Sequence, residues 1–182
     1  MSQQYLRLST KDALSGALNR QGLEKLAKPF YTQNRKNGLT TVLFFVDINK
    51  MKHINDKFGH LHGDLAVKTV AAAVLETIPK NWLCIRYGGD EFLVIGNSKN
   101  YNGEDYCTMI KERLTKKTSV MHLPYNLTAS VGTYSVPPQT DLTLEQAIEN
   151  VDNIMYEQKQ EYHKKNDGVP EHVEGQNGGV SE

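Results

Sequence analysis

The stretch WLCIRYGGDEFLVIG, residues 82–96, predicts two short strands joined by a tight turn. Apolar and β-branched side chains fill both halves, and Gly88 and Gly89 lie between them. Paired glycines can adopt the positive φ angles that primed hairpin turns require, so we expect that conformation for both. A hairpin argues against a wholly parallel sheet, and its turn would present two acids, Asp90 and Glu91.

The segment TTVLFFVD, residues 40–47, predicts another strand. Its apolar, β-branched and aromatic run is typical of a strand buried on both faces, and it ends in Asp47. A carboxylate is costly to bury unless a positive charge compensates it. If the two strands are neighbours, Asp47 and Asp90 could hold Mg²⁺, which takes one or two carboxylates plus water and phosphate oxygens. From these residues alone, two ordinary acids at a strand end and a turn are the simpler explanation.

Helices are predicted around these strands. Leucines at roughly helical spacing from Leu14 to Leu26 indicate a helix that Gly16 and Gly22 interrupt. Residues 50–58 have helical character, and after a glycine-containing break Asp64 would cap an apolar-striped helix.

The rest of the chain continues the alternation of helix and strand. We expect a helix over about 104–115, a strand over 127–136 and a last helix that Thr143 and Gln146 open with a capping box. The order of elements predicts one mixed α/β domain over residues 1–165 with a central sheet. Glycines and acids with almost no apolar residues predict a disordered tail over 166–182.

Length and composition exclude several classes of protein. A chain of 182 residues suits one domain, and 21 basic against 21 acidic residues give no general attraction to nucleic acid or an anionic membrane. Cys84 and Cys107 are too few for a disulfide framework or a four-cysteine zinc site, so we expect reduced core thiols. No apolar run approaches the roughly 20 residues of a membrane span, and no signal peptide is evident. A cytoplasmic location is therefore expected.

Five motifs in order resemble one known family. The hexapeptide YGGDEF, residues 87–92, is the signature of the GGDEF family. Similar to other family motifs are DALSGALNR at 12–20, VDINKMKHINDKFGHLHGD at 46–64, LTASVG at 127–132 and VDNIMYEQK at 151–159. The resemblance covers nearly all of residues 12–159. It implies an α+β fold with a central, mainly antiparallel sheet flanked by helices, similar to nucleotide cyclases and polymerase palm domains.

The resemblance also implies an activity and a metal site. The family's diguanylate cyclases condense two GTP molecules into cyclic di-GMP and release pyrophosphate. Asp47 and Asp90 would be the side-chain ligands of Mg²⁺ or Mn²⁺, and the backbone carbonyl of Ile48 would complete the protein's share. Such an ion favours in-line attack of a ribose 3′-hydroxyl on an α-phosphorus. Glu91 would serve proton transfer or a second metal ion, and the sequence does not separate these roles.

Other residues match the family's nucleotide contacts. Asn55 and Asp64 match the guanine-reading pair, and their chemistry suits guanine, since a carboxylate can accept from N1–H and the exocyclic amine. Expected near the phosphates are Lys52, Lys159 and the close-approaching backbone of Gly88 and Gly89. His60 would support the nucleotide or its loop; its H-x-H spacing with His62 lacks further zinc ligands. Tyr156, near Lys159, is expected in the core.

Some positions depart from the family pattern. Asn49 and Met51 stand where an aspartate and a phenylalanine are common, and His163 stands where an arginine is common, which makes phosphate contacts there doubtful. The family's product-binding R-x-x-D motif is replaced at both ends, by Pro79 and Trp82. We therefore expect no product inhibition through that site.

Two rival functions remain beside a working cyclase. A silent GGDEF domain would bind GTP or cyclic di-GMP and regulate a partner, and a different cyclase output would be a mixed dinucleotide or a cyclic mononucleotide. Asp64 favours guanine in both half-sites. A cyclase would act as a homodimer, since each domain holds one GTP. The chain begins almost at the family's first motif, so it is interpreted as a fragment that follows a sensory domain in a longer protein, such as the cytoplasmic portion of a membrane-bound sensor.

Overall fold

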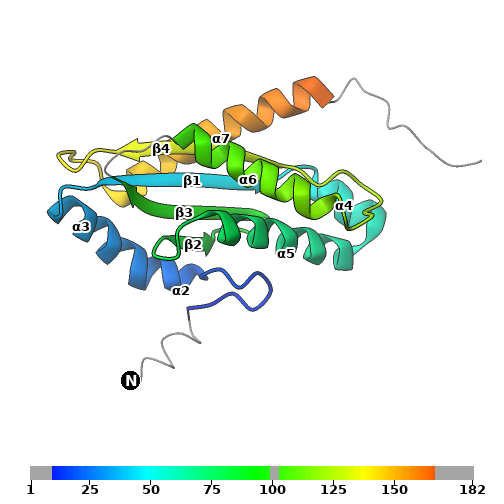
Figure 1. Cartoon of the computed structure of the whole chain (residues 1–182), viewed down its shortest axis with the longest axis horizontal. Coiled ribbons are helices and arrows are strands. Elements are labelled where there is room, and N and C mark those ends of the chain that lie inside the picture. The colour runs from blue at the N-terminus through cyan, green and yellow to red at the C-terminus, as the bar shows by residue number, and fades with distance from the viewer. Residues whose placement is uncertain (1–9, 99–102, 167–182) are drawn as a thin grey trace, which may run out of the picture.

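The computed structural model describes residues 10–98 and 103–166, and it contains a four-stranded sheet covered by helices (Figure 1). The strands are β1 (Thr40–Ile48), β2 (Leu83–Arg86), β3 (Glu91–Ser98) and β4 (Ala129–Val136). They lie in the order β2-β3-β1-β4, and every pairing is antiparallel. The predicted antiparallel sheet is thus confirmed. The tail predicted over 166–182 lies, from residue 167 onward, outside the described residues.

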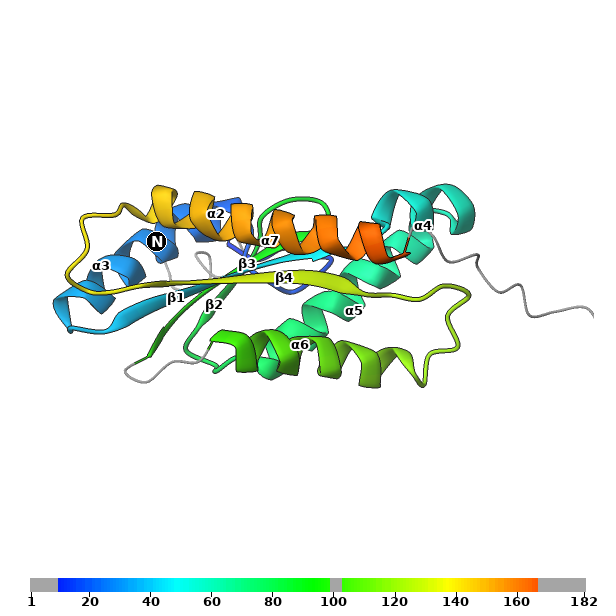
Figure 2. The same ribbon diagram turned by 90° about the horizontal axis from the view of Figure 1, so that it is seen from above.

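Helices cover both faces of the sheet. The helical elements are α2 (Arg20–Gly22), a π-helical stretch η1 (Leu23–Ala27), α3 (Lys28–Lys36), α4 (Met51–Phe58), α5 (His60–Thr77), α6 (Gly103–Thr118) and α7 (Leu144–Asn166). Figure 2 shows α7 and the α2–α3 rod on one side of the strands, with α5 and α6 on the other. None of the helices in the described part of the chain is both long and apolar enough to cross a membrane.

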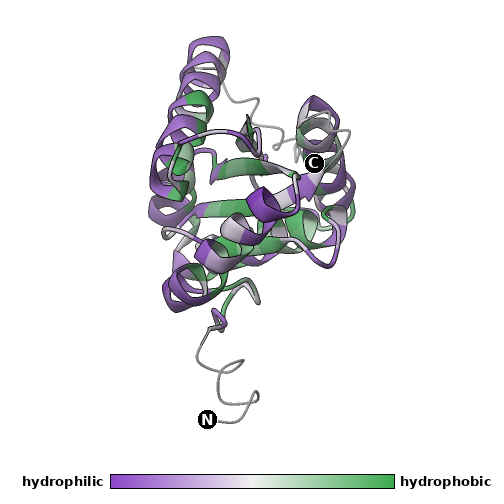
Figure 3. Ribbon diagram, turned by 90° about the vertical axis from the view of Figure 1, so that its left-hand side faces the viewer, coloured by the Kyte–Doolittle hydropathy of each residue, from purple (hydrophilic) through white to green (hydrophobic). Residues whose placement is uncertain are grey.

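The central strand β1 is buried on both faces, as its apolar sequence predicts. Val42, Phe44 and Val46 pack into the core under α5 and α6. Leu43 and Phe45 pack into a second core under α7 and η1. Figure 3 shows the same arrangement by hydropathy, with apolar strands inside and polar outer helix surfaces. Asp47 has the same parity as Leu43 and Phe45, so its side chain belongs to the α7 face.

Two glycines predicted to break helices lie inside them. Arg20 to Lys36 is one continuous helical rod through Gly22, where a Cβ would come within 2.7 Å of the Leu18 Cβ. Asp64 was predicted to be the N-cap of this helix, but α5 begins at His60 with Gly59 as its N-cap, so Asp64 lies within the helix. One glycine costs a helix only about 1 kcal/mol, which close packing readily outweighs.

The prediction for the signature turn was also wrong in its detail. Among the described glycines, positive φ occurs at Gly16, Gly38 and Gly59, and neither Gly88 nor Gly89 has it. The connection is a wider loop in which the N–H groups of Tyr87 and Gly88 both donate to the Glu91 carbonyl, at 2.8 and 3.3 Å. A longer loop does not need the left-handed conformation that a two-residue primed turn demands.

Other local predictions are confirmed, with one exception. The Thr143 N–H donates to Gln146 Oε1 at 2.9 Å and the Gln146 N–H to Thr143 Oγ1 at 3.2 Å, which is the expected capping box. Cys84 and Cys107 are free and buried, and burial raises the pKa of each thiol to about 12. Tyr156, expected in the core, is 58% exposed.

Candidate active site

Asp47 lies where β1 ends, beside the signature turn. Its Cα is paired with that of Glu91 across the β1–β3 ladder, and the Ile48 N–H donates to the Asp90 carbonyl at 3.1 Å. The predicted strand neighbours are therefore real neighbours, and their register brings Asp47, Ile48, Asp90 and Glu91 to one end of the sheet. Asp47 is only 4% exposed.

Lys159 supplies the positive charge that the burial of Asp47 requires. Its Nζ donates to Asp47 Oδ1 at 2.7 Å, and the two side chains are 26% and 6% exposed. Burial raises the pKa of Asp47 and repulsion from Asp90 and Asp152 adds to this rise, while the Lys159 ammonium opposes it. The sequence suggested phosphate contacts for Lys159; the structure adds an ion pair with the expected metal ligand.

Glu91 shares this electrostatic environment. Burial raises the pKa of its carboxyl first, and the charges of Asp47, Asp90 and Asp152 raise it further, against a lowering by Lys159. Asp90 in the turn and Asp152 on α7 thus both act on Glu91 of β3 and on Asp47 of β1 near the end of the sheet. Asp152 was not expected here, although its place two helical turns before Lys159 puts both on one face of α7.

The donor set fits a hard divalent cation. Mg²⁺ and Mn²⁺ prefer oxygen ligands, and the acids at this end of the sheet provide them beside the Ile48 backbone. Within residues 10–98 and 103–166, no three His, Cys, Asp or Glu side chains form a metal cage by themselves. Magnesium does not need one, because water and substrate phosphates usually complete its shell.

The glycine pair in the turn has two different environments. A Cβ on Gly88 would come within 2.2 Å of Glu91 Oε2, so the Glu91 side chain folds over this residue and would have to shift if a larger residue stood there. Gly89 has open space around it. Its carbonyl accepts hydrogen bonds from Arg86, which immediately precedes the signature and was not predicted to belong to the site.

The hairpin formed by α4 and α5 carries the expected nucleotide contacts. It starts at Lys50, whose φ of +55° lies in the left-handed region. Lys52, His60 and Asp64 are exposed on this hairpin, and Asn55 is half-buried. A Cβ on Gly63 would lie 2.0 Å from Asn55 Oδ1, so the missing side chain lets Asn55 approach the helix backbone next to Asp64. The structure therefore places Asn55 against Gly63, the residue that precedes Asp64.

Tyr125 holds this hairpin against the rest of the domain. Its hydroxyl donates to the His62 carbonyl at 3.2 Å, and its ring lies 5.0 Å from that of Phe58. No sequence signal pointed to Tyr125, because it comes from a loop more than 60 residues away along the chain.

Asn49 has a structural role that explains one departure from the family pattern. The side chain is 2% exposed; Nδ2 donates to Thr128 Oγ1 at 3.0 Å, and Oδ1 accepts from Ser130 Oγ at 2.7 Å. These bonds tie the end of β1 to the start of β4. The amide thus fixes the strand end that carries Asp47.

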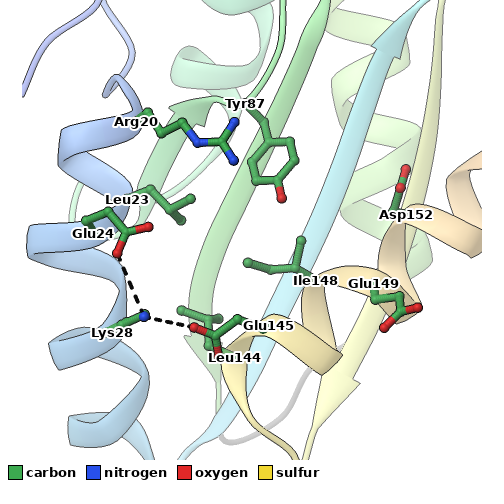
Figure 4. Close-up of a pocket in the computed structure, with 10 residues that line it drawn as sticks. All are labelled: Arg20, Leu23, Glu24, Lys28, Tyr87, Leu144, Glu145, Ile148, Glu149 and Asp152. Atoms are coloured by element: carbon green, nitrogen blue, oxygen red, sulfur yellow. Dashed lines mark ion pairs between the residues drawn. The ribbon is translucent and has the colours of Figure 1, made fainter.

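A pocket of about 310 Å³ lies on the same face, between the α2–α3 rod and α7 (Figure 4). Lys28 crosses it in ion pairs with Glu24 and Glu145, and the guanidinium of Arg20 lies 5.6 Å from the ring centre of Tyr87. None of the expected site residues lines this pocket. It adjoins the acidic strand end through Asp152, which lines it.

Comparison with known proteins agrees with this geometry. A family model described as diguanylate cyclase, GGDEF domain, matches residues 9–165. The probable diguanylate cyclase DgcJ of Escherichia coli K12 is 29% identical over 158 residues, which cover 87% of this chain and 31% of that protein. The Escherichia coli diguanylate cyclase DgcP is 30% identical over 159 residues, covering 86% of this chain and 46% of that protein.

One curated relative is named for a different activity from the two cyclases. The cyclic di-GMP phosphodiesterase PdeR of Escherichia coli K12 is 27% identical over 161 residues, covering 87% of this chain and 24% of that protein. The chain thus spans less than half the length of these three curated relatives.

Among solved structures, the coiled coil and GGDEF domain of DgcB from Caulobacter crescentus, in complex with c-di-GMP, superposes with a TM-score of 0.76 at 24% identity. The match covers 87% of this chain and 84% of that one. Because the family model spans almost the whole described chain and the fold agrees, the chain belongs to the GGDEF diguanylate cyclase family.

Proposed function

We propose that this chain is a working diguanylate cyclase domain, which condenses two GTP molecules into cyclic di-GMP and releases two pyrophosphates. The observation that carries the proposal is the buried carboxylate of Asp47 at the strand end, with Asp90 and Glu91 beside it and Lys159 in contact. Such an acidic site within reach of a lysine suits binding of a cation and phosphates together.

Asp47, Asp90 and the Ile48 carbonyl would hold Mg²⁺ or Mn²⁺. Bound there, the ion would neutralise the triphosphate and polarise its α-phosphate. Lys52 and Lys159 bind the phosphates, and Gly88 and Gly89 let the backbone approach them.

Specificity for GTP comes from the α4–α5 hairpin. Asp64 accepts from the guanine N1–H and amine, and Asn55 offers both a donor and an acceptor beside it. His60, exposed at the start of α5, supports the nucleotide or the loop. Adenine lacks the donor pair that Asp64 reads, so both half-sites take GTP.

The reaction needs two domains. Each holds one GTP, and the 3′-hydroxyl oxygen of one attacks the α-phosphorus of the other while pyrophosphate leaves. Glu91 accepts the hydroxyl proton or holds a second ion. Two such attacks close the ring, so the active form is a homodimer with facing sites. In the whole protein a sensory domain would bring the two together in the cytoplasm.

No product inhibition is expected through the position of the family's inhibitory motif. Trp82 is 8% exposed, and a Cβ on Gly96 would lie 2.1 Å from its ring. It also stacks with Phe44 at 6.1 Å between ring centres. A core indole there provides neither a guanidinium nor a carboxylate for a bound dinucleotide.

The second candidate function is a silent domain that binds GTP or cyclic di-GMP and regulates a partner. The observation that favours it is the ion pair itself, because the Lys159 ammonium occupies an oxygen of Asp47 that a metal ion would need.

The deciding experiment incubates the purified chain, at high concentration, with GTP and Mg²⁺ or Mn²⁺ and identifies the products by chromatography. Cyclic di-GMP that is absent with the Asp90→Ala variant establishes the cyclase, and at saturating GTP added cyclic di-GMP should leave its initial rate unchanged. Tight nucleotide binding without turnover, even in an artificially dimerised form, establishes the silent domain.

A further inference from the structure

The backbone around Asp90 is held on both sides of its α-carbon. The Asp90 carbonyl accepts from the Ile48 N–H at 3.1 Å. The Gly89 carbonyl accepts from Arg86 Nη2 at 2.7 Å and from Nε at 3.3 Å. These two carbonyls belong to the peptide units before and after the Asp90 α-carbon. Since both units are held, the direction in which the Asp90 side chain leaves the backbone is held as well.

Arg86 is in turn held by the N-terminal loop. Its Nη1 lies 3.3 Å from both carboxylate oxygens of Asp12, and each side chain of the pair is 21% exposed. Asp12 also accepts from the Ser15 N–H at 2.8 Å and from Ser15 Oγ at 2.6 Å. Burial acts to raise the pKa of Asp12, but the bonds from Ser15 and the charge of Arg86 together lower it. Asp12 is therefore a charged partner with a fixed orientation.

The loop that carries Asp12 is fastened to the edge strand β2. The Leu18 N–H donates to the Cys84 carbonyl at 2.8 Å, and the Arg86 N–H donates to the Leu18 carbonyl at 2.7 Å. The Asp12 N–H donates to the Ala17 carbonyl at 2.8 Å, which closes the loop on itself. A continuous chain of contacts thus runs from Asp12 through Arg86 to the peptide unit before Asp90.

We propose that Arg86 is a positioning residue for Asp90, and that the Asp12–Arg86 pair couples the N-terminal loop to the acidic strand end. The inference rests on the proposed function, because the direction of Asp90 matters most if Asp90 binds a metal ion. The planar fork of an arginine can bond a carbonyl and a carboxylate at once, which a lysine cannot reproduce. Groups that orient a metal ligand typically contribute about 10- to 100-fold to metal affinity.

The test measures Mn²⁺ binding to the nucleotide-free chain by electron paramagnetic resonance, for the wild type and three variants. Arg86→Met removes the bonds to Gly89 and should weaken Mn²⁺ binding about tenfold. Asp12→Asn keeps the shape of the side chain but removes the charge that holds Arg86. It should also weaken Mn²⁺ binding, but by less than Arg86→Met does. Arg113→Met is the control, because Arg113 also pairs with an acid, Glu76, but does so on α6.

In turnover assays, the Mg²⁺ concentration for half-maximal rate should rise in Arg86→Met, while KM for GTP at saturating Mg²⁺ changes less than twofold. Arg86→Lys should not restore Mn²⁺ affinity. A folded Arg86→Met chain that binds Mn²⁺ like the wild type overturns the inference alone. If that variant does not fold, wild-type affinity in Asp12→Asn overturns it. A wild type that binds no Mn²⁺, either alone or with a non-hydrolysable GTP analogue, overturns the proposed metal site together with this inference.

Discussion

Lys159 and Asp47 form an ion pair at the place where the family resemblance implies a metal ion. The ammonium compensates a carboxylate that is almost fully buried, and in the proposed enzyme the same lysine faces the phosphates. The pair explains how a chain without bound metal tolerates a buried acid beside Asp90 and Glu91.

Replacing Lys159 with methionine should therefore destabilise the metal-free chain. We expect the free energy of unfolding to fall by about 1–3 kcal/mol, since one partner of a buried hydrogen bond is lost. Mn²⁺ should restore part of this loss, because a bound cation replaces the ammonium. Urea unfolding with a chelator and with Mn²⁺ measures both effects. Lys164→Met, an exposed change on the same helix, is the control; equal stability of the two variants would contradict the role of the pair.

Glu91 and Asp47 should make the metal-free chain less stable as the pH rises. Both carboxyls have a pKa raised in the folded state, above 4.5 and 3.8 respectively. The folded state thus binds their protons more tightly than the unfolded state does, so this contribution to stability is present below the unfolded pKa values and is lost as the pH rises through the folded ones.

Glu91→Gln should accordingly stabilise the chain at pH 7 and flatten the pH dependence of unfolding above pH 4.5. The same variant should lower kcat by about 10²- to 10⁴-fold if Glu91 moves a proton. Urea unfolding between pH 5 and pH 8 measures the expected gain in stability, and a turnover assay measures the expected loss of kcat. Glu157→Gln, an exposed change on α7, serves as the control. Lower stability of Glu91→Gln at pH 7 would show that its side chain is structurally needed.

At the scale of elements, the α4–α5 hairpin joins nucleotide recognition to helix packing. Gly63 lies inside α5, where alanine would be the better helix former by about 1 kcal/mol. The approach of Asn55 Oδ1 opposes that preference, because a Cβ would meet it at 2.0 Å. The side chain of Asn55 must move if Gly63 is replaced.

Gly63→Ala should raise KM for GTP and lower the free energy of unfolding by about 1–3 kcal/mol, the usual cost of overpacking. Fluorescent GTP-analogue binding and urea unfolding measure the two effects. Lys68→Ala, an exposed change in the same helix, should leave both unchanged. If Gly63→Ala instead increased stability without weakening nucleotide binding, helix propensity would outweigh the contact with Asn55.

At the scale of the whole molecule, turnover should depend on protein concentration. A single domain offers one set of guanine contacts, on one α4–α5 hairpin, so two domains must meet before a 3′-hydroxyl can reach a second α-phosphate. Specific activity should rise with concentration across the range in which the dimer forms. Fusion of the chain to a dimeric coiled coil should raise the specific activity measured at nanomolar protein concentration. Specific activity that stays constant on dilution, while light scattering reports a monomer, would contradict the homodimer mechanism.

Much of the fold could be predicted because its signals are local. The apolar run of β1, the apolar and β-branched segments on either side of the glycine pair and the capping box of Thr143 and Gln146 each depend on neighbouring residues. Glycine was the main source of error. Gly22 and Gly63 were interpreted as helix breaks, whereas both are sites of close packing. Gly88 was expected to have a positive φ, whereas it lies under the Glu91 side chain without one.

The sequence by itself determined the family motifs, the antiparallel hairpin and the identity of the acids at the strand end, since order and residue type along the chain carry that information. Only the tertiary structure decided that Lys159 compensates Asp47, that Asn49 ties β1 to β4 and that Asp12 reaches the signature turn through Arg86. Those contacts join residues 74 to 112 positions apart. No local pattern encodes them, because they arise only when the register of the sheet brings distant segments to one edge.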